Sequence, residues 1–283
     1  SRKLGDIAND MQVYGSKVYV AVSTSSLIDV INAETATSIK QIPLFANGIA
    51  SQPRQIACHN GKVYVCCFDG SVVKIDTVSL QIEATATAGR NPDGICIANN
   101  KLYVSNSGGL DFPNYDSTVS VFDLNTFSET KKITVKINPA TIKADKYGNI
   151  YVVSKGNYED ISPCLQQINT ATDQVEHLFE IEVAGFDIYN NSMYFYTYDY
   201  STRKALYQIF DLSSKTITNT NFITENSLPK TPYGIDVNPY NGDIYITDAL
   251  DYTSVGDVYC FSKEGKKKFQ FEAGMIPKKV ISN

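Results

Sequence analysis

The sequence contains no tryptophan and only two histidines, His59 and His177. Histidine is the side chain that most often moves protons near neutral pH, and these two occupy different places in the repeat pattern described below, so a histidine-dependent nucleophile or proton relay has little support. From the scarcity and placement of histidine we predict no catalytic residues. No stretch approaches the roughly 18 apolar residues that cross a bilayer, so we expect no membrane-spanning segment.

Cysteine and positive charge are also sparse. The six cysteines lack the Cys-x-x-Cys spacing and the nearby histidine pairs that are typical of zinc sites, so we expect buried free thiols, no metal and no cofactor. The formal net charge is −5, and the one dense basic run, Lys266 to Lys268, is expected at a solvated hairpin tip. Because phosphate binding requires a basic surface, we expect no nucleic-acid partner.

Tyrosine, in contrast, is abundant, with 19 copies, and six of them belong to one repeated strand pattern in which aliphatic residues flank the tyrosine. The copies are residues 17–20, 62–65, 101–104, 149–152, 192–195 and 243–246. Their tyrosines recur about every 40 to 50 residues, the length of a four-stranded propeller blade. The period predicts an all-β fold, a β-propeller with six complete four-stranded repeats in a single domain over residues 1–283.

Each repeat is expected to begin with an inner strand, and most of these strands open with proline, which a strand tolerates at its first residue. Gly94, Gly185 and Gly234 are expected where backbones approach closely near a central channel. Many third strands end in Asp or Asn, which mark the following turn by bonding their own backbone. Residues 277–281 repeat the inner-strand pattern, so we expect a closing strand of a further blade, whose other strands would precede Ser1.

The connections between second and third strands carry the strongest functional signal. In the last four repeats each one places an aromatic residue beside a carboxylate, over residues 107–117, 154–160, 196–201 and 249–254. These loops and the links that enter the inner strands belong to one face of a propeller, and tyrosines on a rigid scaffold give large contact areas at little entropic cost. The alternative is that loops of a tyrosine-rich protein contain tyrosine by chance. The predicted ligand-binding residues are Asp93, Phe112, Tyr115, Tyr158, Tyr198, Tyr200, Tyr233 and Tyr252.

The Pro-x-x-Ile openings, the Asn-Gly-Lys-Val-Tyr-Val pattern at 60–65 and the Val-Val-Lys-Ile-Asp pattern at 72–76 resemble the YVTN/NHL-like surface-layer propellers. Within these, the chain looks most like the DUF5074 proteins of gut Bacteroidetes, and residues 1–11 are similar to a segment that follows a first pair of strands in that family. The resemblance covers essentially the whole chain. It implies a seven-bladed propeller, secreted or lipid-anchored upstream of Ser1 on the extracellular face of the outer membrane, and related to propellers that capture vitamin B12 for a TonB-dependent transporter.

Together these features predict a non-enzymatic extracellular protein that binds a sizeable organic ligand, a corrinoid or a glycan, for outer-membrane uptake. One alternative is a scaffold whose rim binds another protein, such as the transporter. A second alternative is a metal-dependent lactonase or lyase in which Asp93, Asp187 and Asp236 hold a divalent ion. Against that alternative, carboxylates on inner strands are also expected simply to solvate the channel.

Overall fold

The fold is all-β. A computed structural model describes residues 7–223 and 228–282, and this part of the chain contains strands and turns but no helix. Accordingly, none of these residues belongs to a helix with the length and apolar character needed to cross a membrane. The chain divides into two compact units, the first ending at Ile181 and the second spanning Glu182 to Ser282, and each is described in turn. The prediction of a single domain stays a prediction.

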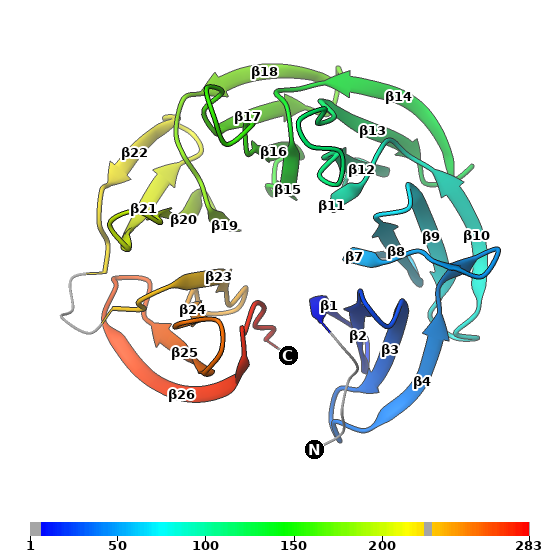
Figure 1. Ribbon diagram of the computed structural model, residues 1–283, viewed down its shortest axis with the longest axis horizontal. Helices are drawn as coiled ribbons and strands as arrows, with labels where there is room; N and C mark the ends of the chain where they lie inside the picture. The colour runs from blue at the N-terminus through cyan, green and yellow to red at the C-terminus, as the bar shows by residue number, and fades with distance from the viewer. Residues whose placement is uncertain (1–6, 224–227, 283) are drawn as a thin grey trace. The chain divides into compact units, whose positions relative to one another are not determined.

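The first unit contains four antiparallel sheets of four strands, here called blades one to four. They are β1 (Ala8–Tyr14), β2 (Lys17–Val22), β3 (Leu27–Asn32) and β4 (Ser38–Pro43); β7 (Pro53–His59), β8 (Lys62–Cys67), β9 (Ser71–Asp76) and β10 (Ile82–Thr87); β11 (Pro92–Ala98), β12 (Lys101–Asn106), β13 (Thr118–Asp123) and β14 (Ser128–Thr134); and β15 (Pro139–Ala144), β16 (Asn149–Ser154), β17 (Cys164–Asn169) and β18 (Gln174–Phe179). A small sheet of β5 (Phe45–Ala46) and β6 (Ile49–Ala50) follows β4. The first strands of successive blades lie side by side (Figure 1).

The second unit contains blades five and six, built in the same way. Blade five consists of β19 (Gly185–Tyr189), β20 (Ser192–Asp199), β21 (Lys204–Asp211) and β22 (Thr216–Asn219). Blade six consists of β23 (Pro232–Val237), β24 (Ile244–Asp248), β25 (Val255–Phe261) and β26 (Lys267–Met275). The six predicted repeats and the propeller class are therefore confirmed.

Turn chemistry sets the register of the blades. At the end of the third strand the side-chain oxygen of Asn32, Asp76, Asp123, Asn169 or Asp211 accepts a hydrogen bond from the backbone N–H two residues on. This confirms the predicted marker of the turn into the fourth strand. Hydrogen bonds from Lys62 and from the Ser79 backbone lower the pKa of Asp76.

The hydrophobic core lies between neighbouring blades. One cluster joins blades one and two around Tyr19, another joins blades two and three around Tyr64, and a third joins blades three and four around Tyr103. Blades five and six share a fourth cluster that contains Tyr194. The described cysteines are all free and five of the six are buried, as the sequence predicts.

Glycine permits the close approach of first strands. A Cβ on Gly94 of β11 would lie 2.2 Å from the carbonyl oxygen of Ala140 on β15. In the second unit, a Cβ on Gly234 would lie 1.9 Å from the carbonyl oxygen of Lys278. Both contacts are shorter than any side chain tolerates, which confirms the predicted role of these two glycines.

Blade six differs from the other blades at its tyrosine. Tyr245 is only half-buried, unlike its five equivalents: Ile244 and Ile246 pack on blade five, and Tyr245 points to the opposite face of the sheet, beside Phe269. Residues 277–281 form no ladder with any described strand, so the closing strand of a further blade stays a prediction. The segment lies against β23, because the Val280 N–H donates to Asp236 at 2.8 Å, as the Val237 N–H donates to Asp187, and Lys279 pairs with the same carboxylate.

Candidate ligand-binding surfaces

Loops of blades two to four meet at one end of the first unit. The β12–β13 loop is tied to the β10–β11 link, because the N–H of Ser107 donates to the Asn91 carbonyl and that of Gly108 donates to the Arg90 carbonyl. At blade four, Lys155 in the β16–β17 loop donates to the carbonyl of Asn138, which precedes β15. The second-to-third-strand loops and the links into the first strands therefore share a face, as predicted.

Three of the predicted residues form a continuous group on this face, here called the aromatic row. The rings of Phe112 and Tyr115 are 6.0 Å apart and those of Tyr115 and Tyr158 are 6.2 Å apart, both close to edge-to-face. Phe112 is 61% exposed and Tyr158 is 69% exposed, whereas Tyr115 is half-buried between them. The row joins the loops of blades three and four and presents aromatic area to solvent.

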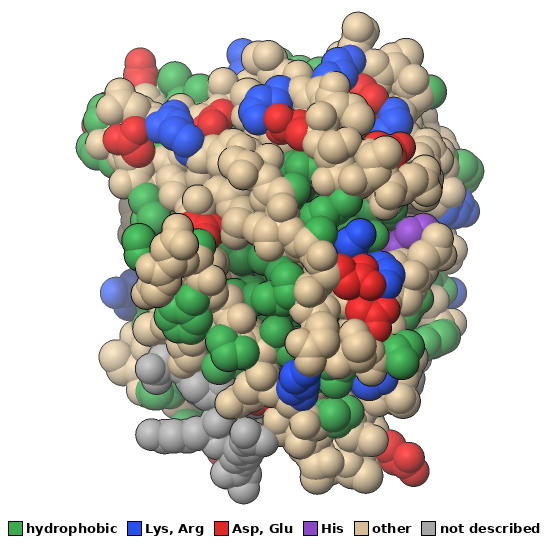
Figure 2. Space-filling view, turned by 90° about the vertical axis from the view of Figure 1, so that its right-hand side faces the viewer, with side chains coloured by type: hydrophobic (Ala, Val, Ile, Leu, Met, Phe, Trp, Pro, Cys, Tyr) green, Lys and Arg blue, Asp and Glu red, His purple; other side chains and the backbone are tan. Residues whose placement is uncertain are grey.

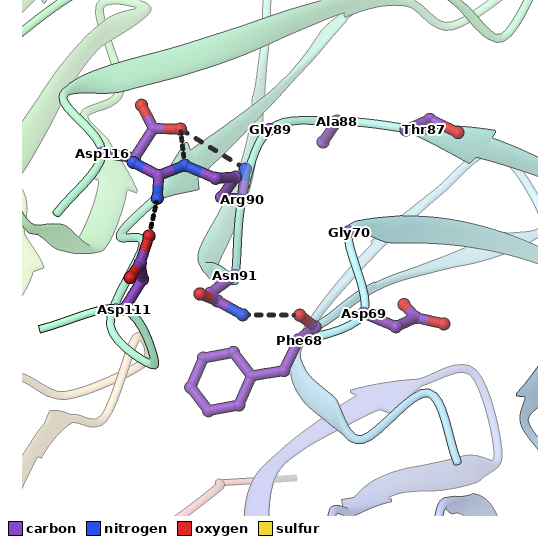
Figure 3. Close-up of a pocket in the computed structure, with 10 residues that line it drawn as sticks. All are labelled: Phe68, Asp69, Gly70, Thr87, Ala88, Gly89, Arg90, Asn91, Asp111 and Asp116. Carbon is purple, nitrogen blue, oxygen red and sulfur yellow. Dashed lines mark hydrogen bonds and ion pairs between the residues drawn. The ribbon is translucent and has the colours of Figure 1, made fainter. Parts of the chain in front are cut away.

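An open pocket of about 480 Å³ is lined by residues of blades two and three (Figure 3). Arg90 organises one wall: its Nη1 donates to Asp111 at 2.6 Å, its Nη2 donates to the Asn114 carbonyl at 2.8 Å, and its Nε lies 3.8 Å from Asp116. Asp111 and Asp116 flank Phe112 and Tyr115 in the sequence, so the pocket and the row share a loop. The complete lining is Phe68, Asp69, Gly70, Thr87, Ala88, Gly89, Arg90, Asn91, Asp111 and Asp116, which gives three carboxylates against one guanidinium.

Asp93, another predicted ligand contact, is engaged by the protein itself. Arg54 donates to its Oδ1 through Nε at 2.9 Å and Nη2 at 2.8 Å, and the Lys155 ammonium lies 3.7 Å from Oδ2. The Arg54 guanidinium also stacks over the Phe68 ring at 4.1 Å. The carboxylate therefore positions two cations between the pocket and the row, instead of projecting as an open acceptor.

The second unit holds the other four predicted residues, here called the tyrosine group. Tyr198 and Tyr200 are 4.8 Å apart, and Tyr233 and Tyr252 are 6.0 Å apart, both edge-to-face. Burial first, and then the neighbouring Tyr200, raise the pKa of Tyr252 to about 12. Tyr198 is buried and Tyr200 is exposed. The structure thus gathers the predicted residues into two groups, and the prediction of one concave face stays a prediction.

Carboxylates in the tyrosine-group loops do not act as the sequence suggested. Asp199 accepts hydrogen bonds from Ser201 and Thr202, and Asp251 accepts them from Thr253 and Ser254. These bonds lower the pKa of both aspartates. Each carboxylate stabilises its own turn.

The carboxylates proposed for a divalent ion are likewise committed to the fold. Asp187 accepts a hydrogen bond from the Val237 N–H at 2.8 Å, and Asp236 holds the segment at Val280. Among the described residues there is no cluster of three metal-ligating side chains. His177 stacks on Phe179 in β18, and His59 ends β7, so the two histidines lie on different blades.

Charge is mixed elsewhere on the surface. Figure 2 shows a face on which Lys and Arg side chains lie beside Asp and Glu side chains. The pairs that Lys62 makes with Asp76, at 2.8 Å, and with Glu83 are of this kind. A polyanion requires continuous positive charge. The expectation of no nucleic-acid partner stays a prediction.

Sequence reasoning missed Arg54, Phe68 and Arg90. The signal was available, because Arg90 lies in a link that enters a first strand and Arg54 directly follows the opening Pro53, both on the face already singled out. What the sequence does not contain is the pairing of these cations with particular carboxylates.

No protein-family model matches the chain, and no curated protein matches it. The chain is similar in structure to a solved structure titled Kuenenia stuttgartiensis hydrazine synthase, with a TM-score of 0.75 and 16% identity over 91% of this chain and 77% of that one. At this level of identity the likeness concerns the fold alone. It supports a β-propeller.

Proposed function

We propose that this protein is a non-enzymatic, extracellular β-propeller that captures an organic ligand with flat apolar faces and a fringe of hydrogen-bond donors. The observation that carries this proposal is the aromatic row beside the carboxylate-rich pocket. The row supplies stacking area. Asp69, Asp111 and Asp116 already accept hydrogen bonds from Ser71, Arg90 and Ser117, so only their remaining lone pairs supply acceptors at its edge. Arg90 and Arg54 lie on the same face, and their guanidinium groups hold the carboxylates beside the row in place.

A corrinoid fits this surface, since it has a broad flat macrocycle fringed by amides. The resemblance to surface propellers that capture vitamin B12 favours the same ligand class, a location on the outer membrane and delivery to a TonB-dependent transporter. A glycan, with apolar ring faces and hydroxyl donors, is the second candidate, because stacked aromatics beside carboxylates serve both ligands.

Calorimetric titration of cyanocobalamin tests the proposal. We expect binding to the intact protein, and a loss of affinity of about tenfold or more in Phe112→Ala and Tyr158→Ala, since each removes a large stacking surface. Tyr147→Ala is the matched control, because Tyr147 is 62% exposed but lies in the turn between β15 and β16, outside the row.

Tyr200→Ala separates the two groups of aromatic residues. Lost affinity in this variant with unchanged affinity in Tyr158→Ala would place the site on the tyrosine group. No heat with cyanocobalamin but binding of an oligosaccharide would replace the corrinoid by a glycan. If neither ligand raises the melting temperature, small-ligand capture is wrong.

A further inference from the structure

The outermost strand of blade six differs from the other outermost strands. β26 has nine residues, whereas β4, β10, β14, β18 and β22 have four to seven. Within the described chain it pairs only with β25, and residues 268–272 are all exposed. An exposed strand edge offers a row of backbone donors and acceptors to another strand.

Two phenylalanines mark the middle of this edge. Phe269 is 46% exposed and Phe271 is 49% exposed, and their rings stack 6.3 Å apart. Proteins usually interrupt an exposed edge with charges, as β14 does with Glu129, Lys131 and Lys132. On β26 the charges instead flank the phenylalanines, with Lys267 and Lys268 before them and Glu272 after them.

We propose that β26 pairs antiparallel with β26 of a second copy of this chain, about a two-fold axis at Gln270. In this register Phe269 of each copy lies opposite Phe271 of the other. Lys268 of each copy lies opposite Glu272 of the other, and Lys267 lies opposite Ala273. A two-fold interface must be self-complementary, and a strand with a basic end, an aromatic centre and an acidic end satisfies this requirement.

The geometry of β26 suits this register. Phe269 to Glu272 pair regularly with β25, and the irregularity near Phe261 falls at Lys268, outside the aromatic centre. Within the chain, Lys268 donates to Asp243 at 2.6 Å and Lys267 donates to Gln270 at 2.7 Å. On pairing, Lys268 exchanges Asp243 for Glu272 of the other copy, and the backbone of blade six keeps its arrangement.

Sedimentation velocity over a concentration series tests the proposal on the full chain, independently of any ligand. We expect a reversible dimer, with a dissociation constant raised at least about tenfold by Glu272→Lys and by the double variant Lys267→Glu/Lys268→Glu. An equimolar mixture of the two variants restores dimerisation, because each then presents the charge that the other lacks. Lys132→Glu on β14 is the control and leaves the dimer intact.

Thermal unfolding of each variant establishes that blade six still folds. Phe271→Glu is a second test of the dimer. It removes the aromatic pair without altering the basic or the acidic end of β26, and we expect this variant to be monomeric as well. A wild-type chain that sediments as a monomer at every concentration overturns the proposal. So does an unchanged dimer in Glu272→Lys, or a mixture of the charge variants that stays monomeric.

Discussion

The hydroxyl of Tyr103 donates a hydrogen bond of 2.6 Å to Oδ1 of Asp173. Tyr103 lies in β12 of blade three, and Asp173 lies in the turn before β18 of blade four, where Lys101 also binds Oδ2 at 2.6 Å. The same tyrosine therefore fills the core between two blades and connects their outer edges. Burial first, and then Asp173, raise the pKa of this tyrosine.

Tyr103→Ala is expected to lower the free energy of unfolding by about 3 kcal/mol, because a fully buried aromatic side chain is removed. Tyr103→Phe keeps the ring but removes the donor to Oδ1 of Asp173, which keeps Lys101 on Oδ2, so we expect a loss of about 1 kcal/mol. Urea denaturation measures both, with the exposed Tyr147→Ala as the control. A loss below about 1 kcal/mol in Tyr103→Ala would show that the tyrosine strands are not core.

The blades were predictable because their signals are local. Alternation, Asn-Gly and Asn-Asn turns, and an Asp or Asn at the end of the third strand each act within a few residues, and they recur with the blade period. The half-burial of Tyr245 could not be predicted in this way, because whether its face is covered depends on what packs against blade six, and no local pattern encodes that. For the same reason the closing strand at 277–281 stays a prediction.

The candidate surfaces were only partly predictable for the same reason. That aromatic side chains would be presented on the second-to-third-strand loops follows from topology, and Tyr115 and Tyr158 do meet. Which hydrogen-bond partner each carboxylate takes does not follow from the topology. Asp251 bonds its own turn and Asp111 bonds Arg90, although both stand beside aromatics in the sequence.

Stability should fall in alkaline solution. Burial, and then Cys58, raise the pKa of Tyr19 in the folded protein to about 12, whereas an unfolded tyrosine titrates near about 10. The unfolded chain therefore releases its proton first. Stability is complete below about pH 10 and is lost toward about pH 12, by about 1.4 kcal/mol per pH unit for each such tyrosine.

Tyr19→Phe isolates this effect, since the hydroxyl of Tyr19 is buried with no hydrogen-bond partner in the described structure. We expect unchanged or slightly higher stability at neutral pH and a shallower decline above about pH 10. The midpoints of urea denaturation of the wild type and of Tyr19→Phe, measured across this pH range, test the prediction. A decline as steep as that of the wild type would mean that Tyr19 does not contribute.

Gly94→Ala should destabilise the first unit. Its Cβ would lie 2.2 Å from the Ala140 carbonyl oxygen, a backbone atom that moves only if β11 and β15 separate. We expect a loss of about 1 to 3 kcal/mol, typical of overpacking. Gly274→Ala, where a Cβ would meet nothing within 4 Å, is the control. Equal effects of the two substitutions would remove close approach as the explanation.

Arg90→Ala should loosen the loop at 107–117 without unfolding the protein. The guanidinium holds Asp111 and the Asn114 carbonyl, which lie on either side of Phe112, so its loss frees the part of the loop that presents the aromatic row. Arg90 is half exposed, and pairs of this kind contribute at most about 1 kcal/mol to global stability. Hydrogen exchange should therefore quicken in this loop while the urea midpoint barely moves.

Ligand affinity of Arg90→Ala should fall as well, because the row must then be ordered on binding. Arg90→Lys, which keeps the charge but loses the two-pronged geometry, should be intermediate. Unchanged exchange in Arg90→Ala would show that the backbone alone fixes the loop, and reduced affinity with unchanged exchange would mean that Arg90 contacts the ligand directly.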